Sequence, residues 1–354
     1  MQKTPKLSII IPLAKIQDIA EELQRLVLEI SRLENLAEGL VQTIFVDNSR
    51  GFCLGHPLRQ IVHNRLHNWI VVGSSPNSVS EARNKGIKQA TGKYLTFVDA
   101  DDGIEAAAYF NVLNLISSSQ HIVDLVFMRY DAVINSQSIN TIHEHKPYSS
   151  SSLEPMDKNK ISNYAVKYIY APRAQNPLTH CWSSLLRRDL VIDKNLKFHS
   201  KYNQLEDISF MCEMLYVSKY VYSCNVLAYH HNLYNPHRLS RQAFFPKDIS
   251  EFVSKQTASV ISLLTNEDER DIERLSSTMI ANHLFMFYIR ALSRSSVFDS
   301  QPTRRLYNQS SPIDQICDYY TPRLGETTML PILLSRKVPH VFVRLAWWLR
   351  TNVL

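Results

Sequence analysis

The chain has 354 residues, of which 45% are hydrophobic and 20% are charged, values typical of a folded protein with a sizeable core. Lys and Arg exceed Asp and Glu by 39 to 33, and four of the six excess positive charges follow Glu326, the last acidic residue. A nucleic-acid-binding protein usually spreads its basic excess along a polar face, so nucleic acid is not an expected partner. The five cysteines form no CxxC pair and no apolar stretch reaches ~18 residues, which argues against a disulfide scaffold, a zinc ribbon or a membrane span. We therefore expect a reduced, cytoplasmic protein of about two domains.

Two apolar runs joined by a helical pattern begin the chain. Residues 7–12 are an aliphatic run that ends in proline, and residues 43–47 are a second run that ends in aspartate. Between them, over about 16–40, apolar residues recur at helical spacing. This order predicts two parallel strands joined by a helix, with ligands bound at the carboxyl ends of the strands. Residues 70–72 predict a third strand.

A second helix and a further strand lead to a cluster of acids. A capping box predicts a helix over 78–90, with Gly92 as its C-terminal cap. Residues 94–98 predict a fourth strand, which is followed by three acids: Asp99, Asp101 and Asp102. Two carboxylates one residue apart can bind the same divalent cation, and oxygen ligands suit Mg²⁺ or Mn²⁺. Taken alone, the cluster fits a solvated acidic turn better than a metal site.

The segment that leads into these acids changes this interpretation. Residues 82–102, with the sequence ARNKGIKQATGKYLTFVDADD, closely resemble the nucleotide-sugar signature of the inverting glycosyltransferases of family 2. The strand that ends at Pro12 and the turn over 46–49 fit the same family in the same order. Together these features cover about the first 105 residues, and an ordered set of this kind is far more specific than a single DxD motif.

The resemblance implies the fold and the organisation of the chain. Members of this family have the GT-A fold, an α/β architecture in which helices flank a Rossmann-like, mixed and mainly parallel sheet. We expect this domain over residues 1–245, with a nucleotide-sugar half over about 1–105 and an acceptor half over about 106–245. Residues 246–354 are expected to form a helical C-terminal region.

The resemblance also implies the residues of the donor site. The nucleotide would contact Pro12, the residue after it, Asp47 and Asn48. Arg83 would contact uracil or the diphosphate, and Asp99 would hold the ribose or a metal-bound water. Asp101, together with Asp99, would hold the divalent metal that bridges the diphosphate. The family often has a second acid where this chain has Asn48; an amide still donates and accepts hydrogen bonds, but the base preference stays open.

The second half of the chain resembles the family more loosely. Glu206 and Asp207 look like the acidic pair that supplies the catalytic base, because an acceptor hydroxyl needs a positioned carboxylate to take its proton. The resemblance assigns the base to Asp207 and the orientation of acceptor or metal to Glu206. The reverse assignment stays open, and so does a structural role for both acids at a helix N-terminus.

Three further residues have weaker assignments. Trp182 lies in a segment that relatives carry near the sugar site, where it could stack on a sugar or belong to the core. Ser240 lies in a loop that can close over the diphosphate. His230 and His231 point to opposite faces of a strand, so at most one of them, His231, would be an additional metal ligand, and an ordinary strand histidine is the favoured interpretation.

The C-terminal region ends in an amphipathic pattern. Over 336–351, basic residues share one side of the predicted helix and aromatic and aliphatic residues share the other. Such a helix can lie on an anionic membrane surface, here the inner face of the cytoplasmic membrane, or pack on its own domain. Both alternatives stay open.

The resemblance predicts an inverting, metal-dependent glycosyltransferase. It would move a sugar from a nucleotide donor, UDP being expected, to a hydroxyl of a glycan or lipid-linked glycan acceptor in the synthesis of bacterial capsule, lipopolysaccharide or teichoic acid. A haloacid-dehalogenase-like phosphatase also places a DxD motif after a strand, but near the start of its domain. A non-catalytic subunit that binds sugar nucleotides is a third class, which loss of the acids would have favoured.

Overall fold

The computed structural model describes residues 4–14, 19–48, 56–74, 78–134, 137–139, 152–170, 176–200, 206–232, 249–265 and 267–280. The chain divides into two compact units. The first comprises residues 1–157 and 180–238, and the second comprises residues 158–179 and 239–354. The second unit therefore combines the segment 158–179 with the C-terminal part of the chain, and the domain bounds expected from the sequence stay a prediction.

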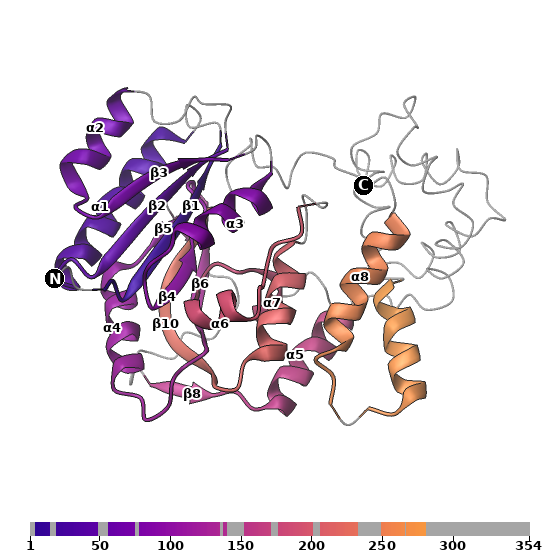
Figure 1. Cartoon of the computed structure of the whole chain (residues 1–354). Helices are drawn as coiled ribbons and strands as arrows, with labels where there is room; N and C mark the ends of the chain where they lie inside the picture. The colour runs from indigo at the N-terminus through magenta and orange to yellow at the C-terminus, as the bar shows by residue number, and fades with distance from the viewer. Residues whose placement is uncertain are drawn as a thin grey trace, which may run out of the picture. The chain divides into compact units, whose positions relative to one another are not determined.

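The first unit is an α/β domain in which strands and helices alternate at the N-terminus (Figure 1). Its first elements are β1 (Leu7–Leu13), α1 (Ala20–Leu36), β2 (Val41–Asp47), α2 (His56–Arg65), β3 (Trp69–Gly73), α3 (Val79–Gln89) and β4 (Tyr94–Phe97). The next are β5 (Gly103–Ile104), α4 (Ala106–Ser117), β6 (Leu125–Ile134), β7 (Gln137–Ile139) and β8 (Leu153–Pro155). The last are β9 (Ser184–Arg187), α6 (Arg188–Asp193), α7 (Glu206–Val217) and β10 (Val221–Asn232).

The strands of the described residues form one mixed sheet in the order β3-β2-β1-β4-β9-β6-β10-β5, with β7 beside β6 and β8 beside β10. β1 is parallel to β2 and to β4, and β2 is parallel to β3. β9 runs antiparallel to both of its neighbours, β4 and β6, and β10 is parallel to β6. β1, β2, β3, β4, β6 and β10 therefore all point in one direction, as the GT-A prediction requires of a mainly parallel sheet.

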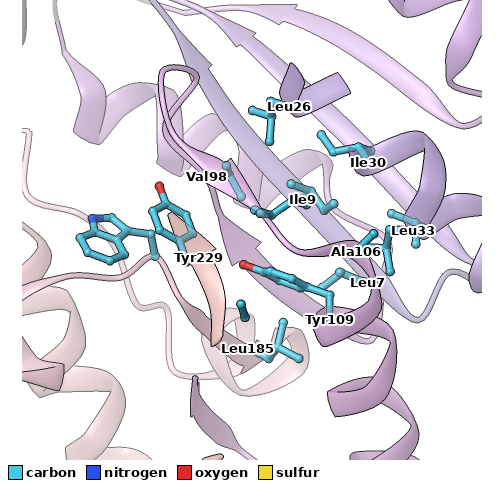
Figure 2. Packing of buried hydrophobic residues seen from close by; sticks show 14 of the residues in the cluster. Leu7, Ile9, Leu26, Ile30, Leu33, Val98, Ala106, Tyr109, Leu185 and Tyr229 are labelled. Atoms are coloured by element: carbon cyan, nitrogen blue, oxygen red, sulfur yellow. The ribbon is translucent and has the colours of Figure 1, made fainter. Parts of the chain in front are cut away.

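β1 is buried on both faces, which explains its continuous aliphatic sequence. Because side chains alternate along a strand, Ile9 and Ile10 point to opposite faces. Ile9 packs in a cluster with the apolar side of α1, and Figure 2 shows Leu26, Ile30 and Leu33 of that helix beside it. On the other face, a Cβ atom on Gly86 of α3 would lie 2.3 Å from Cγ2 of Ile10, so glycine lets α3 pack closely on β1.

The predicted helix-cap role of Gly92 is wrong. α3 ends at Gln89, and Ala90 is its C-cap with an extended backbone. Gly92 lies against β1, where its N–H donates to Oγ of Ser8 (2.8 Å) and an added Cβ would lie 2.5 Å from the backbone nitrogen of Ser8. The glycine is therefore needed for this close approach of two backbones.

The second unit is helical where the structure describes it. Its elements are α5 (Lys158–Tyr170), the short 3-10 helix η2 (Pro177–Thr179), α8 (Ile249–Ile261) and a further helix over 269–280. The N–H of Thr265, after α8, donates to Oγ of Ser162 in α5 (3.2 Å). The predicted amphipathic helix over 336–351 lies outside the described residues. No helix within the described ranges is both long and apolar enough to cross a membrane.

Candidate active site

The predicted site residues of the first unit lie at one edge of the sheet. The carboxyl ends of β1, β2, β4, β6 and β10 share this edge because these strands run in the same direction. β9 is antiparallel to them, so its amino end, preceded by Trp182, lies there too. This is the edge at which open α/β sheets bind ligands.

The ends of β1 and β2 carry the residues predicted to contact the nucleotide. Pro12 lies opposite Val46, and Asp47 is the buried last residue of β2. The N–H of Asn48 donates to the carbonyl of Leu13 (2.9 Å), and its Oδ1 accepts from the N–H of Ser78 (3.2 Å). Asn48 thus ties the turn after β2 to the start of α3, a structural role that the sequence alone did not indicate.

Arg83 of α3 binds three carboxylates. Its Nη2 donates to Asp99 Oδ1 at 3.0 Å, and its Nη1 donates to Glu206 Oε1 at 2.9 Å and to Asp207 Oδ1 at 2.6 Å. The arginine side chain is 3% exposed, and that of Asp99 is 31% exposed. The structure therefore brings Arg83 and Asp99 of the signature together with the acidic pair of α7, more than 100 residues further along the chain.

Asn84 fixes the loop that precedes α7. Its side chain donates from Nδ2 to the carbonyl of Phe198 (2.8 Å) and accepts on Oδ1 from the N–H of Phe198 (2.9 Å). The Phe198 ring in turn lies 5.3 Å from the Arg83 guanidinium. Asn84, which the sequence did not single out, thus joins α3 to the segment before the acidic pair.

The electrostatics of the cluster suit proton transfer. Burial raises the pKa of Glu206 from 4.5 to about 7, and the charge of Asp207 adds to this, whereas Arg83 opposes it. Burial also raises the pKa of Asp207. The charge of Arg83 lowers this pKa, and the charge of Asp99 raises it. Because one guanidinium faces three carboxylates, its charge does not offset all of theirs. Both carboxylates therefore bind a proton more readily than exposed acids do, a property that a general base uses.

Asp102, the third acid after β4, is a buried structural residue. Its side chain accepts from the Tyr229 hydroxyl (2.7 Å) and from the N–H of Asn232 (2.8 Å), and it lies 3.2 Å from Nδ1 of His231. The Tyr229 hydroxyl also accepts from the N–H of Asp99 (3.2 Å). Asp102 and Tyr229 therefore fix the acidic turn on the end of β10. Sequence reasoning missed both roles, because the partners are about 130 residues apart.

Trp182 packs among other rings beside this turn. The rings of His180, Tyr229 and His231 stack on its indole at centroid distances of 4.0, 4.6 and 4.8 Å, and the residue is 8% exposed. Contact between Trp182 and a sugar stays a prediction. As expected from their strand positions, the two histidines have different partners: His230 lies between Asp131 (2.6 Å) and Glu105 (2.9 Å).

The acidic turn has the donors that a divalent cation prefers. Among the described residues no group of three or more His, Cys, Asp or Glu side chains is arranged to hold a metal ion. Mg²⁺, however, is commonly held by one or two carboxylates together with substrate phosphates. Asp99, which is 31% exposed and accepts from Arg83 on Oδ1, and the half-buried Asp101 offer two such carboxylates at this turn. The remaining predicted site residue, Ser240, lies outside the described residues.

Comparison with known proteins decides the family. The sequence model of Glycosyl transferase family 2 matches residues 8–191, just over half of the chain. The chain belongs to glycosyltransferase family 2. The match includes Arg83, Asp99 and Asp101 but ends before Glu206 and Asp207, so these two acids are placed at the site by the fold. Family membership argues against the phosphatase interpretation.

Two bacterial proteins are similar to this glycosyltransferase. The minor teichoic acid biosynthesis protein GgaB of Bacillus subtilis (strain 168) is 23% identical over 193 residues, which are 54% of this chain and 19% of GgaB. The chain thus spans about a fifth of the length of this curated relative. The crystal structure of S. aureus TarS 1-349 matches with a TM-score of 0.60 and 16% identity over 99% of this chain and 92% of that one.

A second TarS structure, a complex with UDP-GlcNAc, matches with a TM-score of 0.60 and 18% identity over 98% of this chain and 92% of that one. TarS in complex with UDP matches with a TM-score of 0.59 and 17% identity, over 97% and 87%. At these identities the matches establish the fold alone, and they confirm the predicted GT-A architecture.

Proposed function

We propose that this glycosyltransferase transfers a sugar from a UDP-sugar, with inversion, to a hydroxyl group of a teichoic-acid-type polymer. The observation that carries the proposal is the cluster in which Arg83 joins Asp99 of the donor signature to the acidic pair of α7. The donor is supported by the TarS structures, which are complexes of that protein with UDP and with UDP-GlcNAc. The acceptor class is supported by GgaB, which is named for teichoic acid biosynthesis.

Asp207 is the proposed base. The acceptor oxygen attacks the anomeric carbon from the side opposite the diphosphate, and its proton passes to the Asp207 carboxylate. A bond forms between the acceptor oxygen and the sugar, and the bond between the sugar and the diphosphate breaks, so that UDP leaves with the electron pair. Glu206, which Arg83 holds beside Asp207, orients the acceptor in this proposal.

Asp101 and Asp99 are the proposed ligands of a divalent cation. When bound, such an ion offsets the negative charge that develops on the departing diphosphate. Tyr229, which accepts from the N–H of Asp99 and donates to Asp102, would position the same turn for such an ion.

The proposed location is the cytoplasm, as the cysteine composition predicts. If the acceptor is lipid-linked, the predicted helix over 336–351 would bring the enzyme to the anionic inner face of the membrane. This helix and its membrane contact remain part of the proposal.

A transfer assay tests the function. The full chain is incubated with Mn²⁺, one of several UDP-sugars including UDP-GlcNAc, and a polyol-phosphate acceptor, and both UDP release and acceptor mass are measured. We expect UDP release that depends on the acceptor, with a matching gain of one sugar in mass. Asp207→Asn should abolish it, whereas Asp189→Asn, at an exposed acid of α6, should not. UDP-sugar binding without transfer to any acceptor would instead identify a non-catalytic binding subunit.

A further inference from the structure

The three carboxylates around Arg83 differ in what else holds them. If all three are ionised, the single guanidinium leaves two negative charges without a cation, so neutral hydrogen-bond donors decide which acid carries its charge most easily. Among the described residues, Asp207 is the one of the three that receives a second side-chain donor: the Cys181 thiol, whose Sγ lies 3.4 Å from Asp207 Oδ1. Asp207 Oδ1 is therefore held from two sides, by Arg83 and by Cys181.

Cys181 is itself firmly placed. The residue is fully buried in the loop before β9, and its carbonyl accepts from Oγ of Ser184 at 2.6 Å. The next residue, Trp182, pairs with Phe97 at the end of β4 and packs among the stacked rings. The thiol therefore has little freedom to turn away from Asp207.

The thiol stays protonated at neutral pH and so remains a donor. Burial raises the pKa of Cys181, the negative charges of Asp207 and Asp99 raise it further, and Arg83 opposes them. Burial and Asp99 raise the pKa of Asp207, whereas Arg83, the Cys181 thiol and the Cys181 backbone lower it. Glu206 has no such donor from another side chain besides Arg83 within the described residues, and its pKa is about 7.

We propose that Cys181 is a positioning residue of the active site, whose thiol orients the Asp207 carboxylate and favours its ionised form, so that Asp207 rather than Glu206 takes the proton of the acceptor hydroxyl. This inference rests on the proposed function, since it concerns the base of that reaction. The charged groups that face Asp207 are Arg83 from α3, Asp99 after β4 and Glu206 beside it on α7. Cys181 contributes the only neutral side-chain donor to Asp207 in the described part of the chain.

The test compares two substitutions of Cys181 that keep the backbone. Cys181→Ala removes only the thiol, whereas Cys181→Ser retains a donor at the same place. For Cys181→Ala we expect kcat to fall by roughly 2- to 10-fold, the value of one ordinary hydrogen bond, with little change in UDP-sugar affinity. The acid limb of the profile of kcat/KM against pH should move to higher pH, because the ionised carboxylate has lost a donor. In Cys181→Ser the acid limb of this pH profile should stay at its wild-type position.

Cys212→Ala is the matched control, since Cys212 is also fully buried, on α7, and no hydrogen bond joins it to Asp207 in the part of the chain that the structure describes. It should leave the pH profile unchanged. The proposal is overturned if the acid limb of the pH profile does not move in Cys181→Ala, or if it moves equally in Cys181→Ser. If the alanine variant does not fold, a displaced acid limb in Cys181→Ser still overturns the proposal. Absence of transfer by wild-type protein refutes the proposed function instead, which separates the two failures.

Discussion

Glu206→Gln should make the protein more stable at alkaline pH. Burial raises the pKa of Glu206 in the folded state from 4.5 to about 7. Because the folded pKa is the higher one, the contribution of Glu206 to stability is fully present below about pH 4.5 and is lost as the pH rises through about 7. The difference in pKa, at 1.36 kcal/mol per pH unit, amounts to about 3 kcal/mol. Glutamine has nearly the same shape and carries no charge to bury, so the variant avoids this loss.

Thermal unfolding of both proteins from pH 5 to pH 8.5 measures the effect. At 2–4 °C per kcal/mol for a domain of about 200 residues, the variant should melt about 6–12 °C above wild type at pH 8.5, and the gap should narrow towards pH 5. Glu213→Gln, on the same helix and partly exposed, is the control and should show no such trend. A variant that melts below wild type at pH 8.5 would mean that the ion pair with Arg83 outweighs the cost of burying Glu206, and the reasoning would be refuted.

Four further substitutions follow from the same contacts. Asp207→Asn should lower kcat by about 10²–10⁴-fold and keep UDP-sugar binding in a calorimeter; an equal loss of binding would place Asp207 in the donor site instead. Asp101→Ala, like a chelator added to wild type, should abolish transfer, and full activity in excess EDTA would remove the metal from the mechanism. Gly86→Ala should lower the unfolding free energy in denaturant by about 1–3 kcal/mol, because the new Cβ would lie 2.3 Å from Ile10; an unchanged midpoint would show that α3 can shift. Arg83→Lys should lower kcat more than donor affinity, since one ammonium cannot reach three carboxylates; a loss confined to donor affinity would assign Arg83 to the nucleotide.

The elements that the sequence predicted well are those with a strong local pattern. β1 and β2 are buried on both faces, as their continuous runs predict. Half of the predicted capping box before α3 forms: Oγ of Ser78 accepts from the N–H of Glu81 (3.3 Å), whereas the N–H of Ser78 donates to Asn48 instead. α2 was not predicted, because its sequence HPLRQIVHNR is largely polar and has no clear apolar side. The insertion of the short β9 between β4 and β6 depends on pairing over about 90 residues, which no local pattern encodes.

For the candidate site, too, local patterns were predictable and long-range contacts were not. The signature residues could be found because they are contiguous, and the strand before them places them at the correct edge of the sheet. The sequence could not show that Asp102 is the buried acid of that turn, since its hydrogen-bond partner Tyr229 lies far along the chain, on β10. The donor role of Cys181 was equally hidden, because it exists only when the loop before β9 meets α7.

Arg83 has one role implied by the family resemblance and another shown by its contacts in the structure. The resemblance implies that this arginine contacts the nucleotide, and direct contact requires an accessible guanidinium. In the structure both Nη atoms are bound to carboxylates and the side chain is 3% exposed, so its charge acts within the protein. Removing the one guanidinium of this set would leave three carboxylates without a cation, and breaking a buried ion pair in this way costs about 3–5 kcal/mol. The residue that the sequence assigns to the donor is therefore also the one that holds the proposed base, and a change at Arg83 must affect the acceptor step whether or not it touches the nucleotide.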